Sequence, residues 1–275
     1  MENIINIILL SILLYYIFKL YKQILRWKTL YWPVMSIFGH RGAIIPGIIE
    51  NRISAFQFAI DNHAYGLELD TRLTKDNQLV VFHNTSIENK NTGEYQQIHQ
   101  HALSELQLIS EPQIQTLDNF FLWLKSTSTP NYPLNIEIKM DTNNSVLNKQ
   151  QSALILLKTI QKYRPLFYNI TIQCFDIELL REIRNITTQP VTSFLVETQE
   201  ELNIFLRSQK YICHVDILSP HFSLVNKYLI MNMHKYGVKV LPWTVNSINV
   251  FNKLSKMGID GIITDYPHLM TTLPK

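Results

Sequence analysis

The feature that most constrains this chain is an alternation of short apolar runs with longer amphipathic segments after Pro33. The runs are rich in Val, Ile and Leu, and the longer segments carry apolar residues at helical spacing. We expect strands at 35–39, 66–72, 79–83, 134–139, 169–175, 191–196, 215–219, 239–245 and 261–265. We expect helices at 52–63, 117–126, 147–162, 176–184, 199–208, 223–236 and 247–257. Strands that are mostly followed by a helix predict a parallel sheet.

The number of strand and helix units favours a barrel over an open sheet. Both architectures fit the alternation, but about eight units within residues 34–275 are typical of a TIM (β/α)8-type barrel. Because nine strands are expected, one of them must lie outside the barrel. Residues 72–79 resemble a hairpin turn, so 66–72 and 79–83 are expected to pair directly. The polar stretch 84–116 has weak periodicity and is expected to be a small insertion off the barrel.

The amino terminus has a different character, because residues 3–18 carry no charge and are rich in Ile and Leu. Their length is close to the lower limit for a transmembrane helix, roughly 17 residues. Glu2 precedes the apolar run and basic residues follow it, which favours an uncleaved anchor over a signal peptide. We therefore expect residues 1–33 to be a membrane anchor with its juxtamembrane segment. The alternative is a buried or interfacial helix of a soluble protein.

The flanking residues predict an orientation for that anchor. Four basic residues lie on its carboxyl side: Lys19, Lys22, Arg26 and Lys28. The positive-inside rule then places residues 34–275 in the cytoplasm. Three aromatic residues suit the interfacial belt: Trp27, Tyr31 and Trp32.

Charge and cysteine content exclude several other classes. The net charge is only +3, and the Lys and Arg residues are scattered, so nucleic acid is not an expected partner. Cys174 and Cys213 have no spacing typical of a zinc site or a disulfide framework, and we expect two reduced thiols. No feature of the sequence indicates a protein partner.

Charged and imidazole side chains gather at the carboxyl ends of the expected strands, where parallel barrels build their active sites. His40 and Arg41 follow the first strand, within the turn 39–42. His83 ends the strand at 79–83. Two histidines beside a phosphate can divide proton abstraction from protonation of the leaving group.

Three carboxylates are expected in the same region. Alternation along the strands places Glu68 and Asp70 on one face, and Glu137 and Lys139 on one face of a later strand. Carboxylates facing a barrel interior need a cation, and oxygen ligands favour Mg²⁺ or Ca²⁺ over Zn²⁺. Arg41 and Lys139 can offset phosphate charge. Together these groups suffice for cleavage of a phosphodiester.

Each of these residues also has a simpler interpretation. Glu68 and Asp70 fit the polar face of an antiparallel edge strand, and Glu137 with Lys139 fits a surface ion pair. His83 alone fits a structural role. Their common position at strand ends favours the active site. The other histidines show no such pattern and are expected to be structural or on the surface: His63, His99, His101, His214, His221, His234 and His268.

Seven blocks of the sequence resemble, in order, those of the glycerophosphodiester phosphodiesterase family. They are 39–42 (GHRG), 50–56, 67–76, 79–83, 135–139 (NIEIK), 243–246 (WTVN) and 261–267. The resemblance implies a TIM barrel with a small insertion, which the stretch 84–116 fits, and a divalent cation. In that family the first step uses the glycerol hydroxyl next to the phosphate as the nucleophile. The resulting cyclic phosphate is then opened by water.

The resemblance also implies roles for individual residues. Carried over by position, His40 and His83 correspond to the acid/base pair, and Arg41 and Lys139 to phosphate contacts. Trp243 corresponds to a wall beside the alcohol. The metal ligands correspond to Glu68, Asp70 and Glu137, and Glu50 to a residue near the metal or the substrate. Two positions depart from the family pattern. Asn84 replaces the usual Asp after the second histidine, and the loop 46–51 that presents Glu50 is stretched.

The expected function is hydrolysis of a glycerophosphodiester to an alcohol and sn-glycerol 3-phosphate with one divalent cation. The expected anchor adds a variant, a lysophospholipase D that acts on lysophospholipids at a membrane. Two alternatives remain at this point. One is a cyclising or sphingomyelinase D-like phosphodiesterase. The other is a non-catalytic, membrane-tethered barrel that binds a phospholipid headgroup, which is compatible with Asn84 and the stretched loop.

Overall fold

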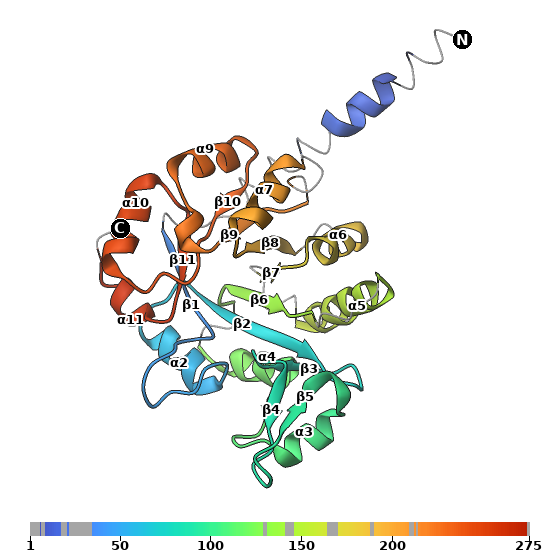
Figure 1. Ribbon diagram of the computed structural model, residues 1–275, viewed down its shortest axis with the longest axis vertical. Coiled ribbons are helices and arrows are strands. Elements are labelled where there is room, and N and C mark those ends of the chain that lie inside the picture. The colour runs from blue at the N-terminus through green and yellow to red at the C-terminus, as the bar shows by residue number, and fades with distance from the viewer. Residues whose placement is uncertain are drawn as a thin grey trace.

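The structure, a computed structural model, forms a nearly closed barrel of eight parallel strands with helices around it (Figure 1). It describes residues 6, 9–17, 21, 35–128, 131–140, 146–163, 170–187, 190–208, 212 and 214–273. The barrel strands are β1 (Ser36–Gly39), β2 (Gly66–Leu73), β6 (Leu134–Ile138), β7 (Ile170–Cys174), β8 (Val191–Val196), β9 (Ile217–Pro220), β10 (Lys239–Val240) and β11 (Gly261–Thr264). The surrounding helices are α2 (Ile53–Asp61), α4 (Leu117–Ser126), α5 (Val146–Tyr163), α6 (Ile177–Ile186), α7 (Gln199–Arg207), α9 (Lys227–Lys235), α10 (Ile248–Met257) and α11 (Pro267–Met270).

The strands follow the order β10-β9-β8-β7-β6-β2-β1-β11. Backbone hydrogen bonds link the two ends of this order: Asp260 N donates to Val240 O at 3.1 Å, and Ile263 N donates to Pro242 O at 2.9 Å. The extra strand β3 (Leu79–Val81) pairs antiparallel with β2, which confirms the expected hairpin. The TIM-type barrel is therefore also confirmed.

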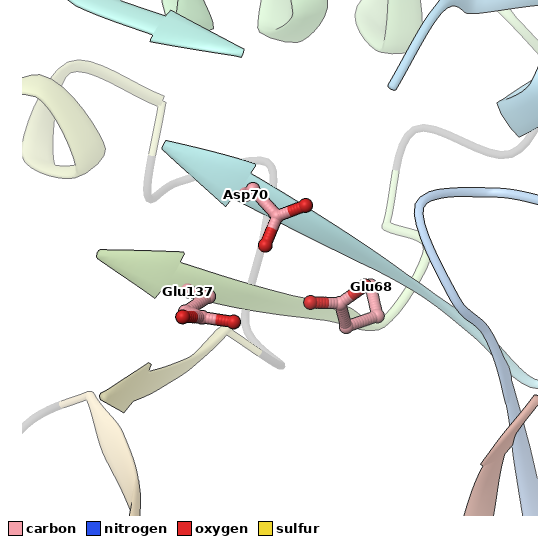
Figure 2. A group of neighbouring side chains, drawn as sticks. All are labelled: Glu68, Asp70 and Glu137. Carbon is pink, nitrogen blue, oxygen red and sulfur yellow. The ribbon is translucent and has the colours of Figure 1, made fainter. Parts of the chain in front are cut away.

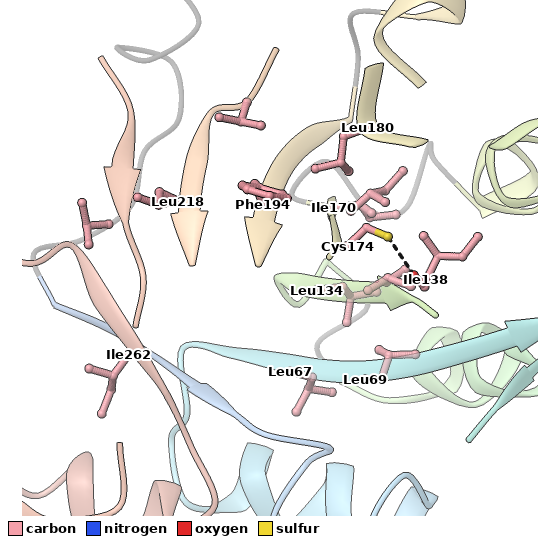
Figure 3. Close-up of a cluster of buried hydrophobic side chains, with 14 of the residues drawn as sticks. Leu67, Leu69, Leu134, Ile138, Ile170, Cys174, Leu180, Phe194, Leu218 and Ile262 are labelled. Carbon is pink, nitrogen blue, oxygen red and sulfur yellow. Dashed lines mark hydrogen bonds between the residues drawn. The ribbon is translucent and has the colours of Figure 1, made fainter. Parts of the chain in front are cut away.

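Apolar side chains occupy both faces of the barrel wall. The outer layer lies between strands and helices, and Figure 3 shows part of it, including Leu67, Leu134 and Leu180. A smaller cluster, including Phe38 and Ile263, is formed by alternate residues of strands on the other side of the wall. Because strands with two covered faces must be apolar along most of their length, the runs in the sequence are nearly continuous.

The stretch 84–116 contains short elements that the sequence did not predict. β4 (Ser86–Glu88) and β5 (Tyr95–Gln97) form a separate two-stranded sheet, followed by the 3-10 turn η1 (Ile98–Gln100) and the helix α3 (Leu103–Ile109). They surround a small apolar cluster of their own: Val80, Ile87, Ile98, Leu106 and Ile114. Strands of three residues are too short to produce a recognisable alternation, so only the insertion itself was foreseeable.

Two expected boundaries differ from the structure by more than two residues. The strand expected at 239–245 ends at Val240 in β10, and the chain continues beside β9 through Pro242, which has no N–H for a ladder. The helix expected from 223 begins at Lys227, because the Asn226 side chain caps it by accepting from Leu229 N at 2.9 Å.

The expectation of a membrane anchor has to be corrected. None of the helices in the described residues is long and apolar enough to cross a bilayer. The anchor in 1–33 and the cytoplasmic placement that depended on it are therefore not supported. The expected interfacial residues Trp27, Tyr31 and Trp32, the four basic residues beside the run, and Cys213 lie outside the described residues.

Candidate active site

The turn 39–42 joins β1 to the stretched loop at the carboxyl-terminal rim of the barrel. A Cβ on Gly39 would lie 2.1 Å from Gly42 O, and Gly42 itself has φ +82°. Only glycine fits such a close approach and such a backbone angle without strain. His40 N donates to Thr264 O of β11 at 2.8 Å, and Arg41 N donates to Glu68 Oε2 at 2.8 Å. The turn therefore holds both side chains at the rim.

The carboxylates come from two neighbouring strands whose register brings them together. Glu68 and Asp70 extend from one face of β2, and Asp70 is paired in register with Glu137 of β6. Figure 2 shows the three carboxylates turned toward one space. Each offers an oxygen within 4.8 Å of the others. Since Glu68, Asp70 and Glu137 are all buried, the edge-strand interpretation of the sequence is wrong.

Hydrogen bonds and ion pairs fix the orientation of these carboxylates. Asp70 Oδ2 accepts from Asn51 Nδ2 at 2.8 Å, and Asp70 Oδ1 lies 3.1 Å from Lys139 Nζ. Lys139 Nζ also donates to Glu137 Oε1 at 2.6 Å. This pair is buried within the site, so the surface ion-pair interpretation is wrong as well. Glu68 Oε1 accepts from Gln173 Nε2 at 2.8 Å.

Burial and neighbouring charges shift the pKa values of the three carboxyl groups in different directions. Burial and the neighbouring Asp70 raise the pKa of Glu68 to about 7. Burial, together with Asp70 and Glu68, raises the pKa of Glu137 to about 8 despite Lys139. Burial alone would raise the pKa of Asp70, but Lys139 and Arg41 hold it well below its usual value. Three buried carboxylates of this kind fit a hard divalent cation.

Arg41 lies between two acidic residues. Its Nη1 donates to both oxygens of Glu50, at 2.8 and 3.0 Å, and its Nε lies 3.1 Å from Asp70 Oδ2. The stretched loop therefore places Glu50 against Arg41 rather than in the carboxylate cluster. Glu50 orients the guanidinium.

The two histidines have different partners at Nδ1. His40 Nδ1 donates to Asp265 Oδ1 at 2.6 Å, and Asp265 Oδ2 accepts from Asn246 Nδ2 at 2.6 Å. His83 Nδ1 donates to Asn84 Oδ1 at 2.9 Å. Burial alone would lower the pKa of His40, but the bond to Asp265 and nearby carboxylate charge raise it. Burial, helped by the charge of Lys139, lowers the pKa of His83.

Most of the expected residues line one cavity of about 340 Å³. They are His40, Arg41, Glu68, His83, Glu137, Lys139 and Trp243. Asp70 and Glu50 do not line the cavity, but each of them contacts Arg41, which does. The Trp243 indole is fixed because Nε1 donates to Ser219 O at 2.8 Å, and its ring meets Phe175 edge to face at 5.5 Å.

Several functional candidates were missed at the level of sequence. Asp265 is 225 residues from His40, and Asn51 and Gln173 contact the carboxylates only after folding. Gln173 had a detectable signal, because it is a polar residue inside a buried strand, in register with Glu137. His221, expected to be structural or on the surface, meets the Trp243 ring at 5.7 Å.

This geometry agrees with what is known of similar proteins. Residues 40–269 match the Glycerophosphoryl diester phosphodiesterase family. The chain belongs to that family. It is 28% identical over 249 residues to a glycerophosphodiester phosphodiesterase of Caldanaerobacter subterraneus subsp. tengcongensis, which covers 86% of this chain and 96% of the relative. The chain is therefore a phosphoric diester hydrolase of this family.

Two further similarities concern a human enzyme and a solved structure. The chain is 27% identical to lysophospholipase D GDPD1 of Homo sapiens over 83% of this chain and 82% of the relative. Its fold matches an Oleispira antarctica phosphodiesterase in complex with the product sn-glycerol-3-phosphate, with a TM-score of 0.71, covering 87% of this chain and 96% of that one. At 18% identity this second match shows the shared fold.

Proposed function

We propose that this family member hydrolyses glycerophosphodiesters to an alcohol and sn-glycerol 3-phosphate, in a reaction that depends on one divalent cation. The observation that carries the proposal is the carboxylate cluster, whose oxygens lie within 4.8 Å of one another beside a cavity lined by both histidines. Such a group of buried carboxylates is costly unless a cation neutralises it. A barrel that only bound a headgroup would not need it.

Glu68, Asp70 and Glu137 would hold the cation, which we propose to be Mg²⁺ or Ca²⁺ because the ligands are carboxylate oxygens. When bound, the cation supplies positive charge to the phosphate oxygens and polarises the phosphorus centre. Lys139 and Arg41 line the same cavity and add positive charge for the phosphate.

His83 is proposed as the general base. Because its Nδ1–H donates to an amide oxygen of Asn84, the neutral ring keeps its lone pair at Nε2. That nitrogen can accept the proton of the substrate hydroxyl as its oxygen attacks phosphorus. Asn84, a departure from the family pattern, therefore suits a base that must be neutral before the reaction.

His40 is proposed as the general acid. Its Nδ1–H donates to the Asp265 carboxylate, and this negative partner stabilises the imidazolium form. Nε2–H can then pass its proton to the alkoxide oxygen as the bond from phosphorus to that oxygen breaks. The roles reverse when water opens the cyclic phosphate, so the pair returns to its starting protonation.

The first substrate proposed is a water-soluble glycerophosphodiester, because a cavity of about 340 Å³ whose lining includes Arg41, Lys139 and two histidines fits glycerol and phosphate. A second candidate is a lysophospholipid, by a lysophospholipase D reaction. The human relative of that name supports it, as does the apolar rim formed by Phe175 and Trp243.

The test is an assay of the purified protein against glycerophosphocholine and lysophosphatidylcholine, with Mg²⁺ or Ca²⁺ and with EDTA. We expect turnover that EDTA and His40→Ala both abolish. His99→Ala, an exposed histidine of the insertion, is the matched control and should retain activity. Failure to cleave either diester, or cleavage that survives both EDTA and His40→Ala, would refute the proposal and favour a non-catalytic barrel.

A further inference from the structure

A second cavity, of about 490 Å³, adjoins the catalytic cavity. We call it the outer cavity and define it by Arg72, Lys149 and Asp176, which line it but not the catalytic cavity. Glu137, Lys139 and Phe175 line both. A molecule whose phosphate lies beside Lys139 can therefore extend into either space. The volume of the outer cavity is in the range of ligand pockets, about 300–1,000 Å³.

The walls of the outer cavity come from elements that the barrel already holds in place. Arg72, at the end of β2, is 7% exposed, and its Nε donates to His83 O at 2.8 Å. Asp176 caps α6 by accepting from Glu178 N at 3.0 Å. Lys149 Nζ, from α5, lies 2.5 Å from Asp176 Oδ2. The charged groups are thus positioned before any ligand arrives.

The charge of the outer cavity is positive. Its described lining contains three basic side chains, Arg72, Lys139 and Lys149, against the two carboxyl groups of Glu137 and Asp176. A positive, partly enclosed cavity attracts anions and repels cations.

The lining also lacks what a quaternary ammonium group requires. Proteins bind such groups against several aromatic faces. Phe175 is the one aromatic side chain among the described residues that line the outer cavity. The cavity is therefore better suited to a polar or anionic group than to choline.

We propose that the outer cavity is the subsite for the leaving alcohol and selects an alcohol that carries an anionic group of its own. The inference rests on the proposed function. The glycerol hydroxyl next to the phosphate must lie near His83, so the catalytic cavity holds the small glycerol moiety. The leaving oxygen of the other alcohol stays within reach of His40 in the catalytic cavity. The rest of that alcohol extends past Lys139 into the outer cavity, where Lys149 and Arg72 contact its anionic group.

The test compares two substrates that differ by one phosphate, glycerophosphoinositol and glycerophosphoinositol 4-phosphate. We expect kcat/KM to be about tenfold higher for the 4-phosphate, as charge-assisted contacts imply. Lys149→Gln should remove most of this preference, whereas Lys149→Arg should keep it. Lys158→Gln, an exposed position on the same helix, is the control. Equal kcat/KM for the two diesters would overturn the inference.

Binding of inositol 1,4-bisphosphate, measured by calorimetry with the metal present, separates this inference from the proposed function. If the protein cleaves neither diester but binds the bisphosphate more weakly after Lys149→Gln, the hydrolytic function fails and the anionic subsite stands. If binding is absent, or is unaffected by Lys149→Gln, the subsite is refuted whatever the activity.

Discussion

Replacing Asp265 by Asn tests the proposed division of work between the two histidines. In the native site, His40 Nδ1 donates to Asp265 Oδ1 at 2.6 Å, and the two side chains are only 15% and 17% exposed. Asp265→Asn keeps an acceptor oxygen for His40 but removes its negative charge. The imidazolium form of His40 then loses its main stabilising partner, and the supply of protonated acid falls.

The size of the effect follows from the contacts. A buried hydrogen bond to a charged group contributes about 1.5–3 kcal/mol, against about 0.5–1.5 kcal/mol for a neutral one. In the variant, the hydrogen bond to residue 265 therefore stabilises the His40 imidazolium by about 1–2 kcal/mol less. Asn246 Nδ2 donates to Asp265 Oδ2 at 2.6 Å, and its Oδ1 is already used by Asp265 N at 2.9 Å. In Asp265→Asn, an amide oxygen that faces His40 leaves the amide nitrogen facing Asn246 Nδ2. Both nitrogens are hydrogen-bond donors, so the native hydrogen bond to Asn246 is lost. We expect an overall decrease in kcat/KM of roughly 10- to 100-fold.

The assay is a pH profile of kcat/KM for glycerophosphocholine at saturating metal. The alkaline limb, which reports loss of the proton on the acid, should move down by about one pH unit in Asp265→Asn, while the acidic limb stays in place. Asp260→Asn is a matched control, because Asp260 also holds a histidine, His234, at 2.8 Å, but precedes β11 at the opposite end of the barrel. A profile for Asp265→Asn within twofold of the native one, with an unmoved alkaline limb, would refute the assignment of His40 as the acid.

Three further predictions concern the base and the carboxylate cluster. Asn84→Asp should raise the pKa of His83 and move the acidic limb of kcat/KM upward by about one unit, as the same pH profile would show. The pKa values of about 7 for Glu68 and about 8 for Glu137 lie above the ordinary 4.5, so the folded metal-free protein binds protons that the unfolded chain has released. The thermal stability of the metal-free protein should therefore fall as pH rises from about 5 to 8. Over the same range, calorimetry should show that metal binding becomes tighter. A metal affinity that does not depend on pH would contradict the prediction. Gln173→Met removes the donor to Glu68 Oε1 and should weaken metal binding about tenfold or more, and unchanged affinity would mean that this bond does not orient the ligand.

Much of the barrel was predictable because its determinants are local. The strand expected at 191–196 and the helix expected at 117–126 have the bounds found for β8 and α4. Local pattern was also enough to find the hairpin of β2 and β3 and the position of the insertion. It was not enough for the three-residue strands β4 and β5, whose pairing depends on the apolar cluster around Ile87. The membrane anchor was expected from an apolar run and its flanking charges, but none of the helices in the described residues is long and apolar enough to cross a bilayer.

What the sequence by itself determined is the set of chemical groups and their placement on each strand. Alternation along β2 put Glu68 and Asp70 on one face, and the turn 39–42 put His40 beside a strand end, because side-chain direction follows from the local backbone period. Only the tertiary structure decided which groups meet. Strand register places Asp70 beside Glu137, and closure of the barrel brings Asp265 to His40 across 225 residues. These contacts depend on register and closure, which arise from packing over the whole barrel and leave no local signal in the chain.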